Sequence, residues 1–282
     1  MKNVSDFIIN TIQLIRPLNV AITFLSVLVA GFICSGNQHL PLELLFASLA
    51  ATFIAASANI INDYYDIEID KINRPERILA SGKMKVRTAF IIYFVSVFGG
   101  LVFSSFVNET ALLIVEGSAL LTFYYSYKFK KIPLLGNAVV AFMTGLAFLF
   151  GGVAVGNIHA AIFPFIFAFT INLMRELVKD MEDAEGDTRA NVITFPVKYG
   201  FENAKMLLYI FGLFLVVAML VPFLLKIYNA KYLLLITFAV VPMLMYSMQI
   251  IHKKNDKASF GKVSLLLKVQ MIFGLLAIYL GI

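Results

Sequence analysis

Nine long apolar segments divide this sequence, and they limit what the chain can fold into. A helix needs about 20 mostly apolar residues to cross the hydrocarbon core of a bilayer. Hydrophobic residues make up 60% of the chain and charged residues only 14%, whereas roughly a quarter of the residues of a soluble domain are charged. We therefore predict an all-α, polytopic membrane bundle of nine transmembrane helices around a central cavity. The predicted spans are 17–36, 41–62, 88–107, 110–127, 134–156, 160–178, 203–226, 231–251 and 263–281.

The basic residues of the connections indicate how this bundle is oriented. Of the 23 Lys and Arg residues, only Lys226 and Lys231 lie in connections that follow odd-numbered spans. The others lie on the face of the N-terminus and of the connections that follow even-numbered spans. Because cytoplasmic loops carry the excess of Lys and Arg, we expect a multi-pass cell-membrane protein with a cytoplasmic N-terminus and an extracytoplasmic C-terminus.

The second predicted span ends in a charged segment, "NIINDYYDIEIDKINRPER" at 59–77, which holds five Asp/Glu and three Lys/Arg residues. Asn62, Asp66 and Asp70 follow one another at four-residue intervals, so in a helix they share one face. Charges near a bilayer interior cost roughly 2.5–3.5 kcal/mol each and usually mark a functional site. Since like charges at this spacing repel, we expect the stripe to bind cations. The role of Asp63, at the edge of the stripe, stays open.

The sixth predicted span ends in a similar segment, "RELVKDMEDAEGDTRANVITFPVKYG" at 175–200. Asp183 and Asp187 have the same four-residue spacing, and Asp180 lies one turn earlier. Both segments close even-numbered spans, so the predicted topology puts them on the cytoplasmic face. This weak repeat predicts a single domain of two four-helix pseudo-repeats and a ninth helix, with a cap on the cytoplasmic side. The boundaries are 1–282 for the domain, 17–127 and 134–251 for the pseudo-repeats, 263–281 for the ninth helix and 63–87 for the cap.

The side chains of both segments indicate a metal and a ligand. Carboxylate and amide oxygens without His or Cys suit Mg²⁺ or Ca²⁺, and Mg²⁺ commonly binds one or two carboxylates plus substrate phosphates. The basic residues near the two segments include Lys71, Arg74, Arg77, Lys128, Lys179 and Arg189. Carboxylates beside Lys and Arg form the combination that binds a metal-bridged polyphosphate. A prenyl diphosphate has such a head on a hydrocarbon tail, and it fits a chain that is nearly all membrane.

Several other kinds of site and partner are excluded by the composition. The single cysteine, Cys34, allows neither an internal disulfide nor a thiolate metal cage, and the three histidines lack the spacing of metal ligands. The N-terminus lacks the pattern of a cleaved signal peptide, so the first span is expected to be retained. The net charge of +6 is explained by the topology, and no nucleic-acid partner is expected.

The motifs Asn62-x-x-x-Asp66-x-x-x-Asp70 and Asp183-x-x-x-Asp187 resemble the paired aspartate-rich motifs of UbiA-type intramembrane prenyltransferases. The similarity covers nearly the whole chain, including "RPLN" at 16–19, "DKINRPER" at 70–77 and "YSYKFKK" at 125–131. "GNAVVAFMTGLAFLFGG" at 136–152 and the segment 175–200 resemble more narrowly the archaeal digeranylgeranylglyceryl phosphate synthases. The second motif is less acidic than in enzymes that prenylate quinone precursors, which argues against 4-hydroxybenzoate as the acceptor.

The resemblance implies a function in archaeal membrane phospholipid synthesis. A geranylgeranyl group would be transferred, with Mg²⁺, from its diphosphate to the free hydroxyl of geranylgeranylglyceryl phosphate. The implied metal ligands are Asn62, Asp66, Asp183 and Asp187, and Asp70 and Asp180 are implied to complete or orient this catalytic set. The implied substrate-binding residues are Arg16, Asn19, Arg74, Arg77, Lys128 and Lys179. Arg16 is a candidate for the phosphate of the acceptor, and an interfacial anchor is an equally good interpretation of it.

Other functions are weaker interpretations of the same features. A cation-coupled transporter would also use acidic pairs, but its site lies near the membrane midplane on broken helices, whereas these acids lie at one face. A CDP-alcohol phosphotransferase needs a D-G-x-x-A-R element, which neither segment contains. Within the family, an aromatic quinone precursor, a haem or a chlorophyll-type acceptor remains the alternative. Glu116, inside the fourth span, is either functional or protonated and hydrogen-bonded, and the glycines of "GLAFLFGG" at 145–152 are expected to bring helices close together.

Overall fold

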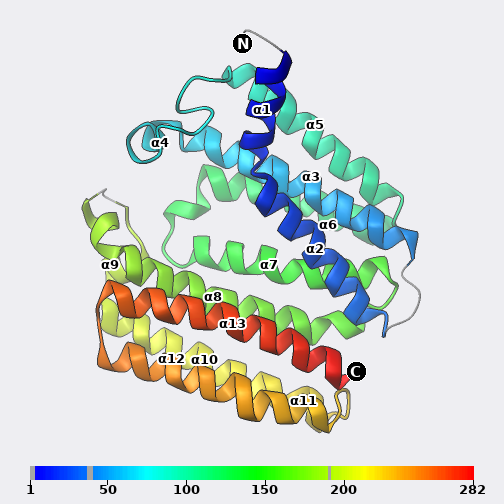
Figure 1. Ribbon diagram of the computed structural model, residues 1–282, viewed down its shortest axis with the longest axis vertical. Helices are drawn as coiled ribbons and strands as arrows, with labels where there is room; N and C mark the ends of the chain where they lie inside the picture. Colours follow the sequence, from blue (N-terminus) through cyan, green and yellow to red (C-terminus); the bar gives the residue numbers. More distant parts are fainter. Residues whose placement is uncertain (1–3, 37–40, 190–191) are drawn as a thin grey trace. The chain divides into compact units, whose positions relative to one another are not determined.

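The computed structural model describes residues 4–36, 41–189 and 192–282, and every regular element within these ranges is a helix (Figure 1). The described chain forms two compact units. The first unit comprises 1–128 and 147–159, and the second comprises 129–146 and 160–282. Helix α7 therefore contributes its later turns to the first unit and its earlier turns to the second.

The first unit is built around helix α3, which packs against α2, α5 and α6. Its apolar residues recur every three or four positions, as a helix buried on one side requires. Asn108 starts α6, because its side chain accepts a hydrogen bond from the Ala111 amide at 2.8 Å. The helices of this unit are α1 Val4–Ile15, α2 Pro17–Cys34, α3 Leu42–Tyr65, α4 Ile67–Asn73, α5 Val86–Ser105, α6 Glu109–Tyr127 and the later part of α7 Leu135–Ala154.

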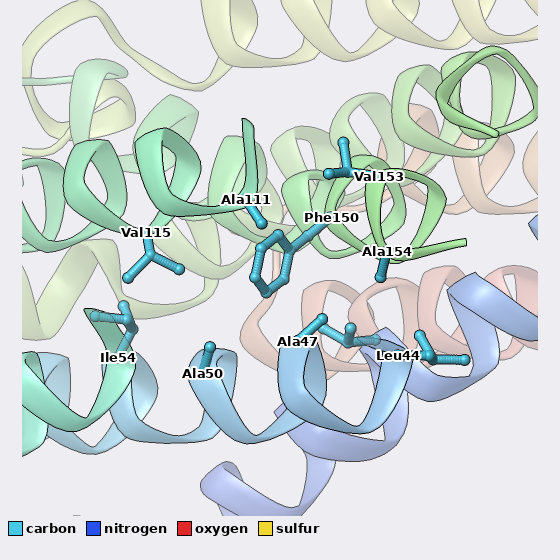
Figure 2. Packing of buried hydrophobic residues seen from close by; sticks show 10 residues of the cluster. Leu44, Ala47, Ala50, Ile54, Ala111, Val115, Phe150, Val153 and Ala154 are labelled. Carbon is cyan, nitrogen blue, oxygen red and sulfur yellow. The ribbon is translucent and has the colours of Figure 1, made fainter. Parts of the chain in front are cut away.

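The core of the first unit lies where α3, α6 and α7 meet (Figure 2). Ala47 and Ala50 of α3 are fully buried, and the ring of Phe150 on α7 fills the space that these small side chains leave. Gly151 brings α7 close to α2, since a Cβ atom there would lie 2.6 Å from the backbone nitrogen of Gly31. The predicted close packing of helices at the glycines of 145–152 is thereby confirmed.

The connection between α4 and α5 is packed, although it is long and rich in charge. Ile78, Leu79 and Met84 are nearly fully buried, in one cluster with Leu14 of α1 and Ile61 of α3. The connection is therefore fixed against the ends of α1, α3 and α5 by apolar contacts. Asn10 of α1 adds a hydrogen bond from Nδ2 to the Lys83 carbonyl at 3.3 Å.

The second unit consists mainly of long helices, the longest of which is α8. Its elements are a 3₁₀ turn at Phe129–Lys131, the earlier part of α7, α8 Ile158–Arg189, α9 Phe195–Tyr199, α10 Phe201–Leu224, α11 Ala230–Leu235, a π-helical turn at Ile236–Val240, α12 Val241–Lys253 and α13 Lys257–Gly281. Helices α11 and α12 continue into each other through the π-helical turn (Figure 1). Gln270 of α13 donates to the Val240 carbonyl at the end of that turn, at 2.8 Å.

The predicted spans agree with the helices except in four places, one of which is the start of α13 at Lys257, six residues before the predicted start at 263. Eight of the described helices are long and apolar enough to cross a membrane, whereas nine were predicted. The predicted span that is missing from these eight is the fourth, 110–127. It forms α6, a helix of 19 residues that is less apolar because it contains Glu109, Glu116 and several Ser, Thr and Tyr residues. Helix α3 continues past the predicted end at 62 to Tyr65, and α8 continues past 178 to Arg189. Asp180, Asp183 and Asp187 of the second segment thus lie on one continuous helix.

Candidate active site

The first acidic segment begins in α3 and crosses a break in that helix. Helix α3 ends at Tyr65, and Asp66 takes up φ −100° and ψ 3° before α4 begins at Ile67. The i→i−4 hydrogen bonds continue across the break, from the Asp66 amide to the Asn62 carbonyl at 3.0 Å and from the Asp70 amide to the Asp66 carbonyl at 2.7 Å. The stripe of Asn62, Asp66 and Asp70 is therefore carried by two helices that meet at Asp66.

This break separates the predicted stripe into two sets of side chains. Asn62 and Asp66 stay together, because Asn62 Nδ2 donates to Asp66 Oδ2 at 2.9 Å. Asp70 belongs to a different set, since its Oδ2 accepts from Arg77 Nη1 at 2.6 Å. Of the three members of the stripe, only Asp70 is nearly fully buried. The tertiary structure thus distinguishes Asp70 from the other two residues, which share its helical register.

Asp63 forms the centre of the second set. Its Oδ1 atom accepts from Nη2 of Arg16 and also from Nη1 of Arg77, the latter at 3.2 Å. The side chain of Asp63 is 5% exposed, and those of Arg16 and Arg77 are 29% and 16% exposed. Two carboxylates and two guanidinium groups form a chain in the order Arg16, Asp63, Arg77, Asp70, and their charges cancel. We call these four residues the arginine clamp.

Arg16 reaches Asp63 from an unusual backbone position between two helices. It lies between α1 and α2 with φ 56° and ψ 77°, in the left-handed region, which costs a non-glycine residue of order 1–3 kcal/mol. Asn59 of α3 supports this turn by donating from Nδ2 to the Ile15 carbonyl at the end of α1, at 2.8 Å. Two polar side chains of α3 therefore hold the junction of α1 and α2 beside the first acidic segment.

The other predicted residues of the first unit lie on its surface. Asn19 is exposed near the start of α2, Arg74 is exposed directly after α4, and Lys128 is exposed at the end of α6. Lys71 pairs with the exposed Glu68 at 2.7 Å. Glu116 is exposed on the surface of α6. None of these side chains belongs to the arginine clamp.

The aspartates of the second acidic segment lie in the last turns of α8. Asp180 is held by α7, since Asn137 Nδ2 donates to Asp180 Oδ2 at 2.8 Å. Asp183 is exposed, and Asp187 is half-buried. One turn before Asp180, Glu176 accepts hydrogen bonds from Lys179 Nζ, at 3.2 Å to Oε1 and 3.1 Å to Oε2. Asp180 is thus bound by a side chain of the protein, as Asp70 is in the first segment.

The residues predicted to bind metal thus form two small groups of oxygen donors. Asn62 and Asp66 lie together at the break after α3, and Asp183 and Asp187 lie one turn apart on α8. Within the described residues, no group of three or more His, Cys, Asp or Glu side chains surrounds a common point. Pairs of oxygen ligands suit Mg²⁺, which binds through one or two carboxylates and takes its remaining ligands from water and substrate phosphates. The donor set therefore fits this metal.

Sequence reasoning missed two features of this site. The first is Asp63, whose role stayed open, and the second is the pair of residues Asn137 and Arg175, which were given no role. For Asp63, the only indication in the sequence is its place directly after Asn62, a predicted metal ligand. No periodicity identifies Asn137, which lies 43 residues before the carboxylate that it binds.

Comparison with known proteins places this arrangement in a family. The model of the UbiA prenyltransferase family matches residues 23–271. The digeranylgeranylglyceryl phosphate synthase of Methanocaldococcus jannaschii is 38% identical over 258 residues, which cover 90% of this chain and 89% of the relative. The synthase of the same name from Methanothermobacter thermautotrophicus is 32% identical over 270 residues, which cover 96% of this chain and 95% of the relative.

Solved structures share the fold over almost the full length. A structure from work on digeranylgeranylglyceryl phosphate synthase in membranes has a TM-score of 0.90 at 35% identity, and the match covers 97% of this chain and 98% of that one. A UbiA homolog from Archaeoglobus fulgidus, bound to DMAPP and Mg²⁺, has a TM-score of 0.68 at 21% identity, with coverage of 95% and 99%. The second likeness concerns the fold alone.

Proposed function

This chain belongs to the UbiA prenyltransferase family, and from that premise we propose that it transfers a geranylgeranyl group to geranylgeranylglyceryl phosphate. One observation carries the choice of substrates: relatives named digeranylgeranylglyceryl phosphate synthase match at 38% and 32% identity over most of both chains. In the reaction, the bond between the prenyl carbon and the diphosphate oxygen breaks, and an ether bond to the acceptor hydroxyl forms. Diphosphate leaves with the bonding electron pair, and the hydroxyl loses its proton.

Mg²⁺ would be held against the diphosphate by Asn62, Asp66, Asp183 and Asp187. The metal would neutralise the charge that develops on the leaving diphosphate. Support for this division comes from the other carboxylates of the two segments, because Asp70 is bound by Arg77 and Asp180 by Asn137. Asp70 and Asp180 would therefore orient the site, as the resemblance to the family implies.

The basic residues would bind the oxygens of the diphosphate. Arg77 has donors beyond the single Nη1 atom that binds Asp63 and Asp70, so it can serve the clamp and a phosphate together. Arg74 and Lys128 would add charge, and Asn19 would bind near Arg16 at the start of α2. Lys179, four residues before Asp183 on α8, would bind a phosphate of one of the two substrates. After the prenyl–oxygen bond breaks, the allylic cation would be kept from water by apolar helices.

The site would lie at the cytoplasmic face of the membrane. The basic residues gather on the face of the N-terminus, which the positive-inside rule makes cytoplasmic. With α6 counted as a ninth span, because it packs against α3 and α5, the C-terminus would be extracytoplasmic. Both substrates would reach the site from the bilayer with their charged heads at the interface.

Purified protein with Mg²⁺, geranylgeranyl diphosphate and geranylgeranylglyceryl phosphate is expected to release diphosphate and to form the diether lipid. Asp66→Ala and Asp183→Ala are each expected to abolish this turnover. Glu68→Ala is the matched control, because Glu68 is an exposed acid of the same segment, with a side chain that is 82% exposed. Product formation is followed by mass spectrometry.

A panel of acceptors decides between this proposal and its alternatives. If the lipid acceptor is not alkylated while an aromatic quinone precursor or a haem is, the substrate assignment is wrong. If Asp66→Ala and Asp183→Ala both retain full turnover on the lipid acceptor, the substrates are right and the site is wrong.

A further inference from the structure

A charge cluster lies on α8 just before the second acidic segment. Arg175 donates from Nη1 to Glu176 Oε1 at 2.9 Å, and Lys179 Nζ lies 3.1 Å from Oε2 of the same carboxylate. The side chains of Arg175 and Glu176 are only 18% and 15% exposed, and that of Lys179 is 41% exposed. Glu176 thus holds two cations side by side, and two positive charges against one negative charge leave the cluster with an excess of one positive charge.

Among the described residues, no atom accepts a hydrogen bond from Nε of Arg175. Its Nε atom is one of three buried side-chain nitrogen or oxygen atoms that have no hydrogen-bond partner in the described part of the chain. The other two belong to the uncharged residues Thr194 and Gln270. Burying an unpaired donor of a charged group is costly, and such a group in a native structure calls for an ion, a water molecule or a functional ligand.

The position of the cluster on the helix relates it to the proposed metal ligands. Arg175, Lys179, Asp183 and Asp187 follow one another at four-residue intervals on the continuous helix α8, so they form one ridge. At about 1.5 Å of rise per residue, the Cα atoms of Lys179 and Arg175 lie roughly 6 Å and 12 Å along the axis from that of Asp183. A ligand held by the two cations would be beside the metal-binding pair and separate from it.

The chemistry of the cluster suits a phosphate monoester. A guanidinium group presents a planar fork of donors that matches two phosphate oxygens, and a neighbouring ammonium group adds a point charge. In the proposed reaction, the acceptor carries its phosphate and its reacting hydroxyl on neighbouring carbons of glycerol. The acceptor phosphate must therefore bind close to the metal-bound diphosphate without taking its place, as a site at Arg175 allows.

We infer that Arg175, with Lys179 beside it, binds the phosphate of the acceptor lipid and makes the protein prefer a phosphorylated acceptor. This inference rests on the proposed function and adds to it the residue that recognises the acceptor. Arg16, the sequence-based candidate for this role, gives part of its guanidinium group to Asp63. Glu176 acts as a positioning residue, since it holds Arg175 and Lys179 next to each other.

The test compares two lipids that differ only in the phosphate. Binding of geranylgeranylglyceryl phosphate and of geranylgeranylglycerol is measured by thermal shift without Mg²⁺, and KM is measured for both substrates with Mg²⁺. Arg175→Gln is expected to weaken binding of the phosphorylated lipid and to raise its KM roughly ten- to hundredfold, as expected for lost hydrogen bonds to a charged group. Affinity for the uncharged lipid and KM for geranylgeranyl diphosphate are expected to stay unchanged.

Arg87→Gln is the matched control, because Arg87 is an exposed arginine near the start of α5 and is expected to behave like the wild type. Arg175→Lys keeps the charge and removes the fork, so it is expected to weaken binding of the phosphorylated lipid several-fold. It also tests the inference if Arg175→Gln does not fold. The binding measurement distinguishes the role of Arg175 from the proposed function. A wild-type protein that binds the phosphorylated lipid but never alkylates it would contradict only the proposed function.

Three results would overturn the inference. One is equal affinity of Arg175→Gln and wild type for the phosphorylated lipid. Another is a rise in KM for geranylgeranyl diphosphate, which would assign Arg175 to the donor. The third is that Arg16→Gln, and not Arg175→Gln, removes the preference for the phosphorylated lipid.

Discussion

Asp63, which is buried, forms an ion pair with the half-buried Arg16, a residue 47 positions away in the sequence. Arg77, which is 14 positions after Asp63, binds the same carboxylate oxygen at 3.2 Å. Two arginines expected to bind substrate are therefore positioned by a residue that belongs to neither metal-binding pair. The geometry of these two arginine side chains therefore depends on Asp63.

Asp63→Ala is expected to lower the free energy of unfolding by about 3 kcal/mol, because it leaves two half-buried guanidinium groups without their shared carboxylate. Thermal or denaturant unfolding in detergent measures the effect. Glu68→Ala is the control, since the exposed pair of Glu68 with Lys71 is expected to contribute less than about 1 kcal/mol. Equal stability of the two variants would show that the arginine clamp contributes nothing to the fold.

Chelation of divalent metal with EDTA is expected to stop turnover, and added Mg²⁺ is expected to restore it. Asn62→Ala removes one proposed oxygen ligand, so it is expected to raise the Mg²⁺ concentration needed for half-maximal turnover about tenfold, as loss of a metal-supporting group typically does. Titration of activity against Mg²⁺ measures this. An unchanged Mg²⁺ dependence in Asn62→Ala would remove Asn62 from the ligand set.

Asn137→Ala is expected to lower the free energy of unfolding by about 1 kcal/mol, since Asp180 loses the hydrogen bond that ties α8 to α7. Turnover is also expected to fall, because Asp180 lies one turn from the proposed ligand Asp183. Asn203→Ala removes a bond to the Tyr199 carbonyl of similar type, at 2.6 Å on the surface. This control is expected to stay within about 0.5 kcal/mol of the wild type, and a larger loss there than at Asn137 would refute the prediction.

Gly151→Ala is expected to destabilise the first unit by about 1–3 kcal/mol through overpacking. The added Cβ atom would lie 2.6 Å from the Gly31 nitrogen and 2.9 Å from the Val27 carbonyl oxygen, and both atoms belong to the backbone of α2. Gly117→Ala is the matched control, since nothing lies within 4 Å of its added Cβ. That helical substitution is expected to stabilise the protein by about 0.5–1 kcal/mol, so the two melting temperatures should move in opposite directions.

The start of α13 is expected to weaken in acid. Asp256 accepts from the Ser259 amide and from Ser259 Oγ, both at 2.9 Å, and these hydrogen bonds lower the pKa of its carboxyl group. A lowered pKa in the folded state means that the cap stabilises the fold above the unfolded pKa of about 4. The stabilisation is lost as the pH falls below that value through the folded pKa.

Melting temperatures of the wild type and of Asp256→Ala, measured between pH 2.5 and 7, test this. The difference between them is expected to be constant above about pH 5 and to shrink in more acidic buffer. Asp256→Ser is the control, because serine also caps helices but does not titrate. A difference that persists unchanged at the lowest pH would contradict the role of the ionised carboxylate.

The sequence alone determined the helices and the composition of the site. Apolar segments long enough to span a bilayer must form helices there, because no water is available to bond a free backbone. For this reason the predicted spans match the helices, apart from the less apolar α6 and the longer α3, α8 and α13. The four-residue spacing of the aspartates placed Asn62 beside Asp66, and the paired motifs identified the family, as the match over 23–271 confirms.

Only the tertiary structure decided what each charged residue of the two segments binds. Asp66 and Asp70 have the same helical register, yet Asp70 pairs with Arg77 because Ile78 and Leu79, in the connection after α4, pack against α1 and α3. Asp63 meets Arg16 because α1 turns into α2 beside α3. Asp180 meets Asn137 because α7 packs against α8. A helical period fixes which side chains share a face. It does not say which distant segment will pack against that face, and that segment supplies the hydrogen-bonding or charged partner.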